Sequence, residues 1–162
     1  MIVKPINDVK KSLFKKFDCG NKALNEYLQK YANQNEKNHL SRTYILENDG
    51  SILGYVTLCN TQIDAKEMPS DYSKLPKYPI PGVKIARLAV DIEYQRKHFG
   101  EMLLTFALKR IVLVSASVGI KVVVVDAKEE SRQFYEKYGF ISLTNNSLTY
   151  ILPIETVLKA LL

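Results

Sequence analysis

The sequence predicts an α+β or mixed α/β fold in which helices flank a mixed sheet. Two strand-like stretches, 83–90 and 122–125, enclose a helical pattern at 99–117, and this order is typical of a right-handed parallel crossover. Tight-turn residues at 48–50 and 145–147 each separate two short strand patterns and predict antiparallel hairpins. With 162 residues, about the length of one domain, the chain is expected to form a single domain over residues 1–162.

The N-terminal half contains one expected helix and one hairpin. Apolar residues recur at helical spacing through residues 21–37, which predicts a helix. The first hairpin joins strands at 43–46 and 52–59. Four of the six prolines fall within residues 68–82, which predicts a long loop before the strand at 83–90.

The C-terminal half alternates between helices and strands. The β-branched run at 122–125 is typical of a strand that is covered on both faces. The expected elements are, in order, a helix at 99–117, a strand at 122–125, a short helix at 129–138, a hairpin of strands 140–143 and 148–152, and one or two helical turns at 154–162.

The composition has the balance of a soluble globular protein, with 46% hydrophobic and 25% charged residues. No apolar run approaches the length of a membrane span, and the N-terminus lacks the apolar core of a signal peptide. Two cysteines, Cys19 and Cys59, and two histidines lie far apart without metal-ligand spacing, so no metal site is expected. We expect reduced thiols and a cytoplasmic location.

Basic residues concentrate at the N-terminus of a chain whose formal net charge is +6. Residues 1–42 contain nine of the 23 basic residues and four of the 17 acidic ones, so this quarter carries most of the net charge. Such a segment favours a polyanionic partner, because Lys and Arg that neutralise phosphates release counterions. The alternative is a solvated face that keeps the protein soluble.

An expected anion site lies where the strand at 83–90 leads into the next helix. The letters IARLAVD at 85–91 are followed by QRKHFG at 95–100, where the helix begins. N–H groups in the first turn of a helix lack intrahelical acceptors, and the helix dipole favours an anion there. Arg96 and Lys97 add two cationic side chains, so we expect a diphosphate site that is neither a Walker loop nor a dinucleotide GxGxxG motif.

This turn resembles the pyrophosphate loop of the GNAT N-acetyltransferases, Gln/Arg-x-x-Gly-x-Gly/Ala. Further matches follow in the family's order: the strand at 122–125, DAK at 126–128, and FYEKYGF at 134–140, which is similar to the family's FYEKxGF motif. The resemblance spans roughly residues 50–152. It implies a GNAT fold, whose central mixed, mostly antiparallel sheet contains a splayed parallel strand pair. It also implies acetyl-CoA as co-substrate, with no metal.

The same resemblance implies which residues bind acetyl-CoA. The backbone of the strand would hold the pantetheine arm, and the loop would hold the diphosphate. The expected residues are Leu88, Ala89, Val90, Gln95, Arg96, Lys97, His98, Phe99, Gly100, Glu101 and Lys128.

His98 departs from the pattern, because it stands where the loop usually has its first glycine. Glycine allows left-handed dihedral angles and a close approach of the backbone to phosphate. We expect His98 to be tolerated, because histidine is among the residues enriched in the left-handed region. Its ring N–H could also contact the phosphates.

A narrower resemblance covers nearly the whole chain. Segments similar to a toxin branch of the superfamily are FDCG, LNEYL, ANQN and SRTY within residues 17–44, LPKYP at 75–79, ARLAVD at 86–91 and VDAK at 125–128. Members of that branch acetylate the amino group of aminoacyl-tRNA, block translation and are held inactive by a ribbon-helix-helix antitoxin. The resemblance therefore implies aminoacyl-tRNA and such an antitoxin as partners, and it leaves a homodimer open.

Tyr135 aligns with the tyrosine that the family uses as general acid toward the leaving sulfur. A phenol with a pKa of about 10 is protonated at neutral pH and can donate to a thiolate. The alternative is that Tyr135 is a packing residue. No base stands out, and an α-amino group with a pKa of about 8 needs no strong one.

Four basic residues are expected to contact tRNA: Lys30, Lys37, Arg42 and Arg87. The alternative for Lys30, Lys37 and Arg42 is a solvated side chain, and the alternative for Arg87 is a structural ion pair.

Two other functions stay open at this point. One is a free-standing enzyme that acetylates a small amine or a protein lysine, which an acidic pocket would favour. The other is a non-catalytic module that binds CoA or only a partner protein, for which His98 is the main support.

Overall fold

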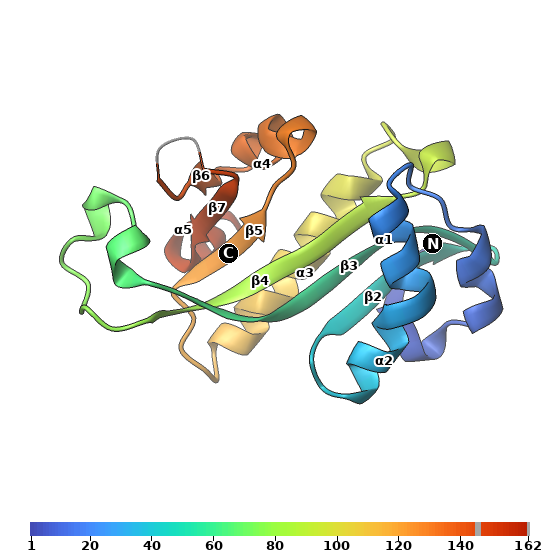
Figure 1. The fold of residues 1–162 in the computed structure, drawn as a ribbon, viewed down its shortest axis with the longest axis horizontal. Helices are drawn as coiled ribbons and strands as arrows, with labels where there is room; N and C mark the ends of the chain where they lie inside the picture. Colours follow the sequence, from blue (N-terminus) through green and yellow to red (C-terminus); the bar gives the residue numbers. More distant parts are fainter. Residues whose placement is uncertain (145–146, 162) are drawn as a thin grey trace. The chain divides into compact units, whose positions relative to one another are not determined.

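The computed structural model describes residues 1–144 and 147–161 (Figure 1). Its strands are β1 (Ile2–Pro5), β2 (Arg42–Asn48), β3 (Ser51–Ile63), β4 (Ile80–Val90), β5 (Val122–Asp126), β6 (Ile141–Ser142) and β7 (Thr149–Pro153). They form one sheet in the order β1-β2-β3-β4-β5-β7-β6. β4 and β5 pair in parallel, whereas β1–β2, β2–β3, β5–β7 and β6–β7 are antiparallel. The predicted mixed α/β class is confirmed.

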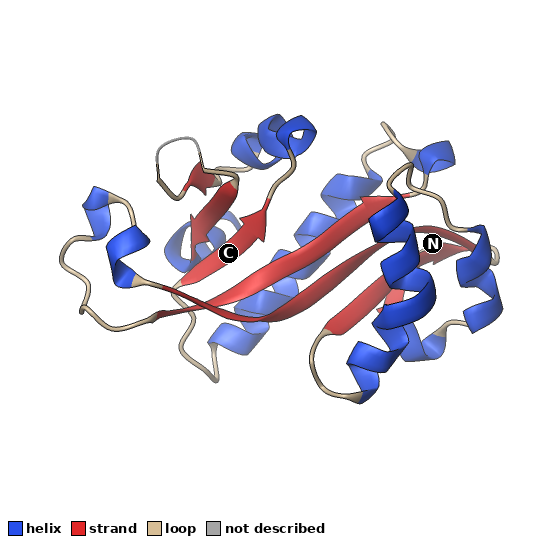
Figure 2. Ribbon diagram, viewed as in Figure 1, coloured by secondary structure: helices blue, strands red, loops and turns tan. Residues whose placement is uncertain are grey.

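The helices are shown in blue in Figure 2. They are α1 (Lys22–Glu26), α2 (Ala32–Lys37), α3 (Phe99–Ser115), α4 (Arg132–Lys137) and α5 (Ile154–Leu161). A π-helical turn, Tyr27–Tyr31, joins α1 to α2, so the predicted helix at 21–37 is present with one widened turn. Its start is fixed by Asn21, whose side chain accepts a hydrogen bond of 3.1 Å from the N–H of Leu24.

The chain separates into two compact units. The first unit contains Met1–Cys59 and Ala86–Leu108, and the second contains Asn60–Ile85 and Lys109–Leu162. The expectation of one domain over residues 1–162 stays a prediction. Among the described residues, no helix combines the length and the apolar character that crossing a bilayer requires.

The core of the first unit packs the N-terminal helices on β2 and β3. Its buried members are Ile6, Val9, Phe14, Phe17, Tyr27, Leu28, Ala32, Ile45, Ile52, Tyr55 and Ala89. Tyr55 is fully buried, and its hydroxyl donates a 2.7 Å hydrogen bond to the carbonyl of Leu24, which fixes α1 on β3. Burial raises the pKa of this phenol far above its usual value.

The core of the second unit lies on β5 and β7. Its buried members are Ile63, Met68, Ile80, Val122, Val124, Leu143 and Ile151. Tyr72 and Leu75 from the proline-rich loop are partly buried against it, so this loop is anchored by side chains of its own. The loop is shorter than predicted, because β4 already begins at Ile80. Ile80 is buried, and the parallel pairing with β5 starts two residues later, at Gly82.

Other boundaries differ by a few residues. β1 was not predicted from the sequence, because four residues that include Lys4 and Pro5 show no clear alternation. β3 runs on to Ile63 rather than ending at Cys59. The predicted helix at 129–138 is a 3-10 turn, Glu129–Ser131, followed by α4. The predicted turn at Asn145-Asn146 and the last residue of the terminal helix, Leu162, lie outside the described residues.

Candidate functional site

The expected diphosphate site is an exposed loop of the first unit, between β4 and α3. Asp91 caps a 3-10 turn, Ile92–Tyr94, with a 3.0 Å hydrogen bond from the N–H of Glu93 to its carboxylate. Two residues of the loop then adopt left-handed dihedral angles, Arg96 with φ +63° and His98 with φ +68°. Left-handed residues within a turn gather successive backbone N–H groups into a concavity that binds anions.

The start of α3 completes this loop. Phe99 is its first residue, and the N–H groups of the first turn of a helix have no intrahelical acceptor, so they and the helix dipole suit an anion. Arg96 and Lys97 are exposed, and the Lys97 ammonium lies 5.9 Å from the ring centroid of Tyr94. The loop conformation, the helix end and the two cations together fit the diphosphate of acetyl-CoA.

His98 takes the strained position that the sequence comparison singled out. Its side chain is 81% exposed, and Nδ1 lies 3.4 Å from a carboxylate oxygen of Glu101. His98 adopts, with its Cβ in place, a left-handed φ that usually favours glycine.

The side chain of Gln95 is hydrogen-bonded to the main chain. The amide Nε2 donates to the carbonyl of Cys19 at 2.9 Å and to the carbonyl of Val90 at 2.8 Å. Both N–H groups of the amide are therefore used by the main chain.

Close packing holds β4 and α3 beneath this loop. A Cβ at Gly54 on β3 would lie 2.6 Å from the carbonyl oxygen of Ala89 and 2.8 Å from a methyl carbon of Leu103, so only glycine fits there. The parallel pairing of β4 with β5 ends at Ile85 and Val125, before residues 88–90 are reached. Backbone groups of Leu88, Ala89 and Val90 are therefore not used by that pairing, as a site for the pantetheine arm requires.

Tyr135 lies on α4, in the second unit, and is only 6% exposed. Its ring meets the ring of Phe134 edge to face at 5.1 Å and that of Phe140 at 5.5 Å. This burial raises the pKa of the Tyr135 phenol to about 12, so the hydroxyl is protonated and able to donate at neutral pH. Lys128, in the same unit, is exposed and precedes the 3-10 turn that leads to α4.

The four basic residues expected to contact tRNA all belong to the first unit, and three of them have partners there. Lys30 pairs with Glu26 at 3.0 Å, a hydrogen bond that raises the lysine pKa. The guanidinium of Arg87 lies 3.6 Å from the ring centroid of Tyr27. Lys37 is exposed at the end of α2.

Arg42 has the strongest structural role of the four. Its Nη1 lies 2.6 Å from the carboxylate of Glu36, which is 8% exposed. The same carboxylate accepts a 3.1 Å hydrogen bond from the N–H of Thr43. Arg42 and Glu36 thus join α2 to β2, and removal of Arg42 would leave a buried carboxylate without its cation.

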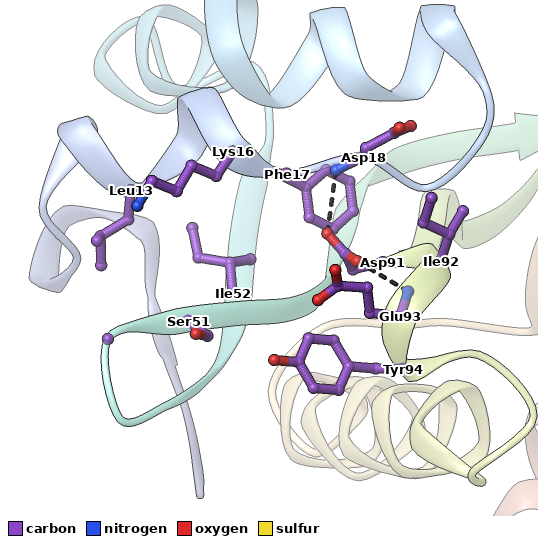
Figure 3. Close-up of a pocket in the computed structure, with 11 residues that line it drawn as sticks. Leu13, Lys16, Phe17, Asp18, Ser51, Ile52, Asp91, Ile92, Glu93 and Tyr94 are labelled. Carbon is purple, nitrogen blue, oxygen red and sulfur yellow. Dashed lines mark hydrogen bonds between the residues drawn. The ribbon is translucent and has the colours of Figure 1, made fainter.

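A cavity of about 410 Å³ in the first unit was not anticipated from the sequence. It is lined by Leu13, Lys16, Phe17, Asp18, Gly50, Ser51, Ile52, Asp91, Ile92, Glu93 and Tyr94 (Figure 3). A helix-capping pattern, Asp91 before Ile-Glu-Tyr, could have identified the local role of Asp91. Nothing in the sequence indicated its contact with Asp18, which is 73 residues away. Among the described residues, no group of three His, Cys, Asp or Glu side chains could hold a metal ion.

Comparison with known proteins identifies relatives over most of the chain. Residues 39–142 match the acetyltransferase (GNAT) domain family. The chain is 30% identical to the tRNA-acetylating toxin of Mycobacterium tuberculosis over 76% of this chain and 75% of that protein.

Two solved structures extend the similarity to nearly every residue. AtaT complexed with acetyl-methionyl-tRNAfMet is 29% identical, covers 99% of each chain and has a TM-score of 0.90. A Tyr-to-Phe mutant of AtaT, bound to the C-terminus of the antitoxin AtaR and acetyl-CoA, is 28% identical, covers 98% of this chain and 96% of that one, and has a TM-score of 0.83. With the family match extending over more than half of its residues, this chain belongs to the GNAT family of acetyltransferases.

Proposed function

We propose that this chain is an acetyl-CoA-dependent N-acetyltransferase that acetylates the α-amino group of aminoacyl-tRNA and thereby blocks translation as a toxin. The observation that carries the proposal is the similarity to AtaT complexed with acetyl-methionyl-tRNAfMet, at a TM-score of 0.90 over 99% of both chains. The tRNA-acetylating toxin of M. tuberculosis supports the same activity. The basic N-terminal quarter is consistent with a polyanionic substrate.

Acetyl-CoA supplies an activated acetyl group as a thioester. The backbone N–H groups of residues 95–101, with Arg96 and Lys97, bind its diphosphate, and the backbone of Leu88, Ala89 and Val90 orients the pantetheine arm and the thioester carbonyl. The geometry of the left-handed loop supports this assignment.

The α-amino nitrogen of the charged tRNA attacks the thioester carbonyl. A C–N bond forms, the C–S bond breaks, and the amine loses a proton to solvent. Tyr135 gives its hydroxyl proton to the leaving sulfur, so CoA departs as a thiol, and the phenolate regains a proton from solvent in place of the one that the amine released. Its buried, protonated phenol suits this role. Lys30, Lys37, Arg42 and Arg87 bind the tRNA, and Lys30, Arg42 and Arg87 also make contacts within the protein.

As such a toxin, this chain acts in the cytoplasm and has an antitoxin as its partner. AtaT is bound to the antitoxin AtaR in a solved structure that is similar over 98% of this chain. A ribbon-helix-helix antitoxin remains what the resemblance of the sequence implies. Aminoacyl-tRNA and acetyl-CoA are both met in the cytoplasm, where expression of the chain alone is expected to arrest growth.

The test is to incubate the protein with labelled acetyl-CoA and total aminoacylated tRNA, with deacylated tRNA as the control. Label is expected on the aminoacylated tRNA alone, and mild alkaline hydrolysis should release it as N-acetyl amino acid. Label in both samples, or in neither, would contradict the proposed substrate. Transfer to a small amine or a protein lysine, without transfer to tRNA, would favour a free-standing acetyltransferase.

A further inference from the structure

The loop of residues 91–98, here called the diphosphate loop, is joined by four hydrogen bonds to residues 18–19 and to the end of β4. The amide of Gln95 bridges the carbonyls of Cys19 and Val90 at 2.9 and 2.8 Å. The N–H of Ile92 donates to the carbonyl of Asp18 at 2.8 Å. In return, the N–H of Asp18 donates to the carboxylate of Asp91 at 3.1 Å, a contact drawn in Figure 3.

The network continues into the first turn of α1. The Asn25 amide donates to the carboxylate of Asp18 at 2.9 Å, and its oxygen accepts from the N–H of Cys19 at 2.8 Å. A 2.8 Å bond from the N–H of Gly20 also reaches the Asp18 carboxylate. These two donors lower the pKa of Asp18, so this side chain is ionised at neutral pH. Residues 18 and 19 are thus held in place by Asn25 of α1.

Gln95 lies at the point of this network where the left-handed stretch of the loop begins. It immediately precedes Arg96, the first left-handed residue of the loop, and His98 is the second. Non-glycine residues stay in that region only where the surrounding structure holds them. Gln95 is the side chain that ties the beginning of this strained stretch to two main-chain carbonyls outside it.

We propose that Gln95 is a positioning residue for acetyl-CoA, which holds the diphosphate loop in its anion-binding conformation by tying it to Cys19 and Val90. Its side-chain amide does not contact the phosphates, because both N–H groups of Nε2 already donate to main-chain carbonyls. This inference rests on the proposed use of acetyl-CoA. It differs from the sequence-based expectation, which grouped Gln95 with residues that contact the co-substrate.

The test compares acetyl-CoA with acetyl-pantetheine, an acetyl donor that lacks the diphosphate, in the wild type and in Gln95→Met. Methionine has a similar length and no charge but cannot donate the two hydrogen bonds. If the loop then adopts its binding conformation about one tenth of the time, the apparent Kd and KM for acetyl-CoA rise about tenfold while kcat changes little. The kcat/KM for acetyl-pantetheine is expected to stay unchanged, because this donor does not use the loop.

Two further variants complete the experiment. Gln62→Met, at an exposed position on β3, is the matched control and is expected to retain the wild-type affinity for acetyl-CoA. Asn25→Ala removes the hydrogen bonds that hold Asp18 and Cys19, the residues to which the loop is tied. It is expected to raise the KM for acetyl-CoA as well, but by a smaller factor. This variant carries the test if Gln95→Met does not fold, which its far-ultraviolet circular dichroism and Tm would reveal.

The possible failures can be told apart. A wild-type protein that shows no heat of acetyl-CoA binding in calorimetry at millimolar concentration would reject the proposed function itself. If the wild type binds but Gln95→Met keeps the wild-type KM for acetyl-CoA, the positioning role is wrong. An equal loss of kcat/KM with both donors would also overturn it, because that result indicates a general structural effect rather than one confined to the diphosphate loop.

Discussion

The diphosphate loop of the first unit and Tyr135 of the second unit are prepared for acetyl transfer in opposite ways. The loop is exposed, and its proposed function depends on the backbone conformation at Arg96 and His98. Tyr135 is 6% exposed among aromatic rings, and its proposed function depends on one hydroxyl group. Because the loop would bind through backbone N–H groups, it should tolerate changes of its side chains but be sensitive to residues that support its backbone. The role of Tyr135 depends on one hydroxyl, so it should be lost when that hydroxyl is removed.

The largest effect is expected from Tyr135→Phe. This change removes the hydroxyl and keeps the ring, so the edge-to-face contacts with Phe134 and Phe140 remain. Loss of a general acid lowers a rate by about 10²–10⁴. Steady-state kinetics should show this loss in kcat, while calorimetry should show the wild-type Kd for acetyl-CoA. Unchanged turnover would make Tyr135 a packing residue.

The same variant should change the response of stability to alkaline pH. Burial raises the pKa of Tyr135 from 10.0 to about 12 in the folded protein, so the folded state favours the neutral phenol more than the unfolded state does. This contribution is complete below pH 10 and is lost as the pH rises through 12. Two pKa units correspond to about 2–3 kcal/mol. Denaturant unfolding between pH 10 and 12 should therefore show a steeper loss of stability for the wild type than for Tyr135→Phe, and parallel curves would argue against the raised pKa.

Gly54→Ala tests the support of the backbone site. The new Cβ would meet the carbonyl oxygen of Ala89 at 2.6 Å and Leu103 at 2.8 Å, so β4 or α3 must shift. Overpacking of this kind costs about 1–3 kcal/mol in the free energy of unfolding, and acetyl-CoA affinity should fall with it. Gly119→Ala is the matched control, because nothing lies within 4 Å of its added Cβ. If both variants unfold at the same denaturant midpoint, the close packing at Gly54 is not important for stability.

A smaller effect is expected from removing Lys30 and Lys37 together. Arg42 is left in place, because its contact with the buried Glu36 would confuse binding with stability. Each phosphate contact that is lost should flatten the log–log dependence of tRNA binding on salt by about 0.7–0.9, and the KM for aminoacyl-tRNA should rise. The control removes the same charge elsewhere, at the exposed Lys109 and Lys159. Equal salt dependence in both double variants would mean that the basic N-terminal quarter is only a solvated face.

Short sequence patterns predicted the helices and strands whose formation depends on residues close together in the chain. The helix at 21–37 follows from apolar spacing and the capping residue Asn21, and the strand at 122–125 follows from four consecutive valines. The motif order also placed the left-handed loop between β4 and α3, and the structure shows that His98 adopts the dihedral angles expected of the family's glycine.

Contacts between distant residues could not be predicted in this way. The bond from Gln95 to Cys19 joins residues 76 positions apart, and the stacking of Arg87 on Tyr27 depends on how β4 passes the π-helical turn. Gln95 was expected to bind acetyl-CoA and Arg87 to bind tRNA, and both side chains are in contact with the protein itself. Their expected roles in binding stay predictions, as do those of the other site residues.

The smallest effect is expected from His98→Gly, and it is the sharpest test of a site made of backbone. Glycine relieves the strain of a Cβ at φ +68°, a gain of about 1–2 kcal/mol at most. It also adds about 0.5–1 kcal/mol of conformational entropy to the unfolded chain. The net change in stability should therefore be small, and the Kd for acetyl-CoA should be unchanged or slightly lower. His98→Ala separates the two properties of histidine, because it removes the imidazole and retains the Cβ. A Kd that rises to the same extent in both variants would show that the ring itself contacts the phosphates, and the diphosphate would then be held by a side chain as well as by the loop.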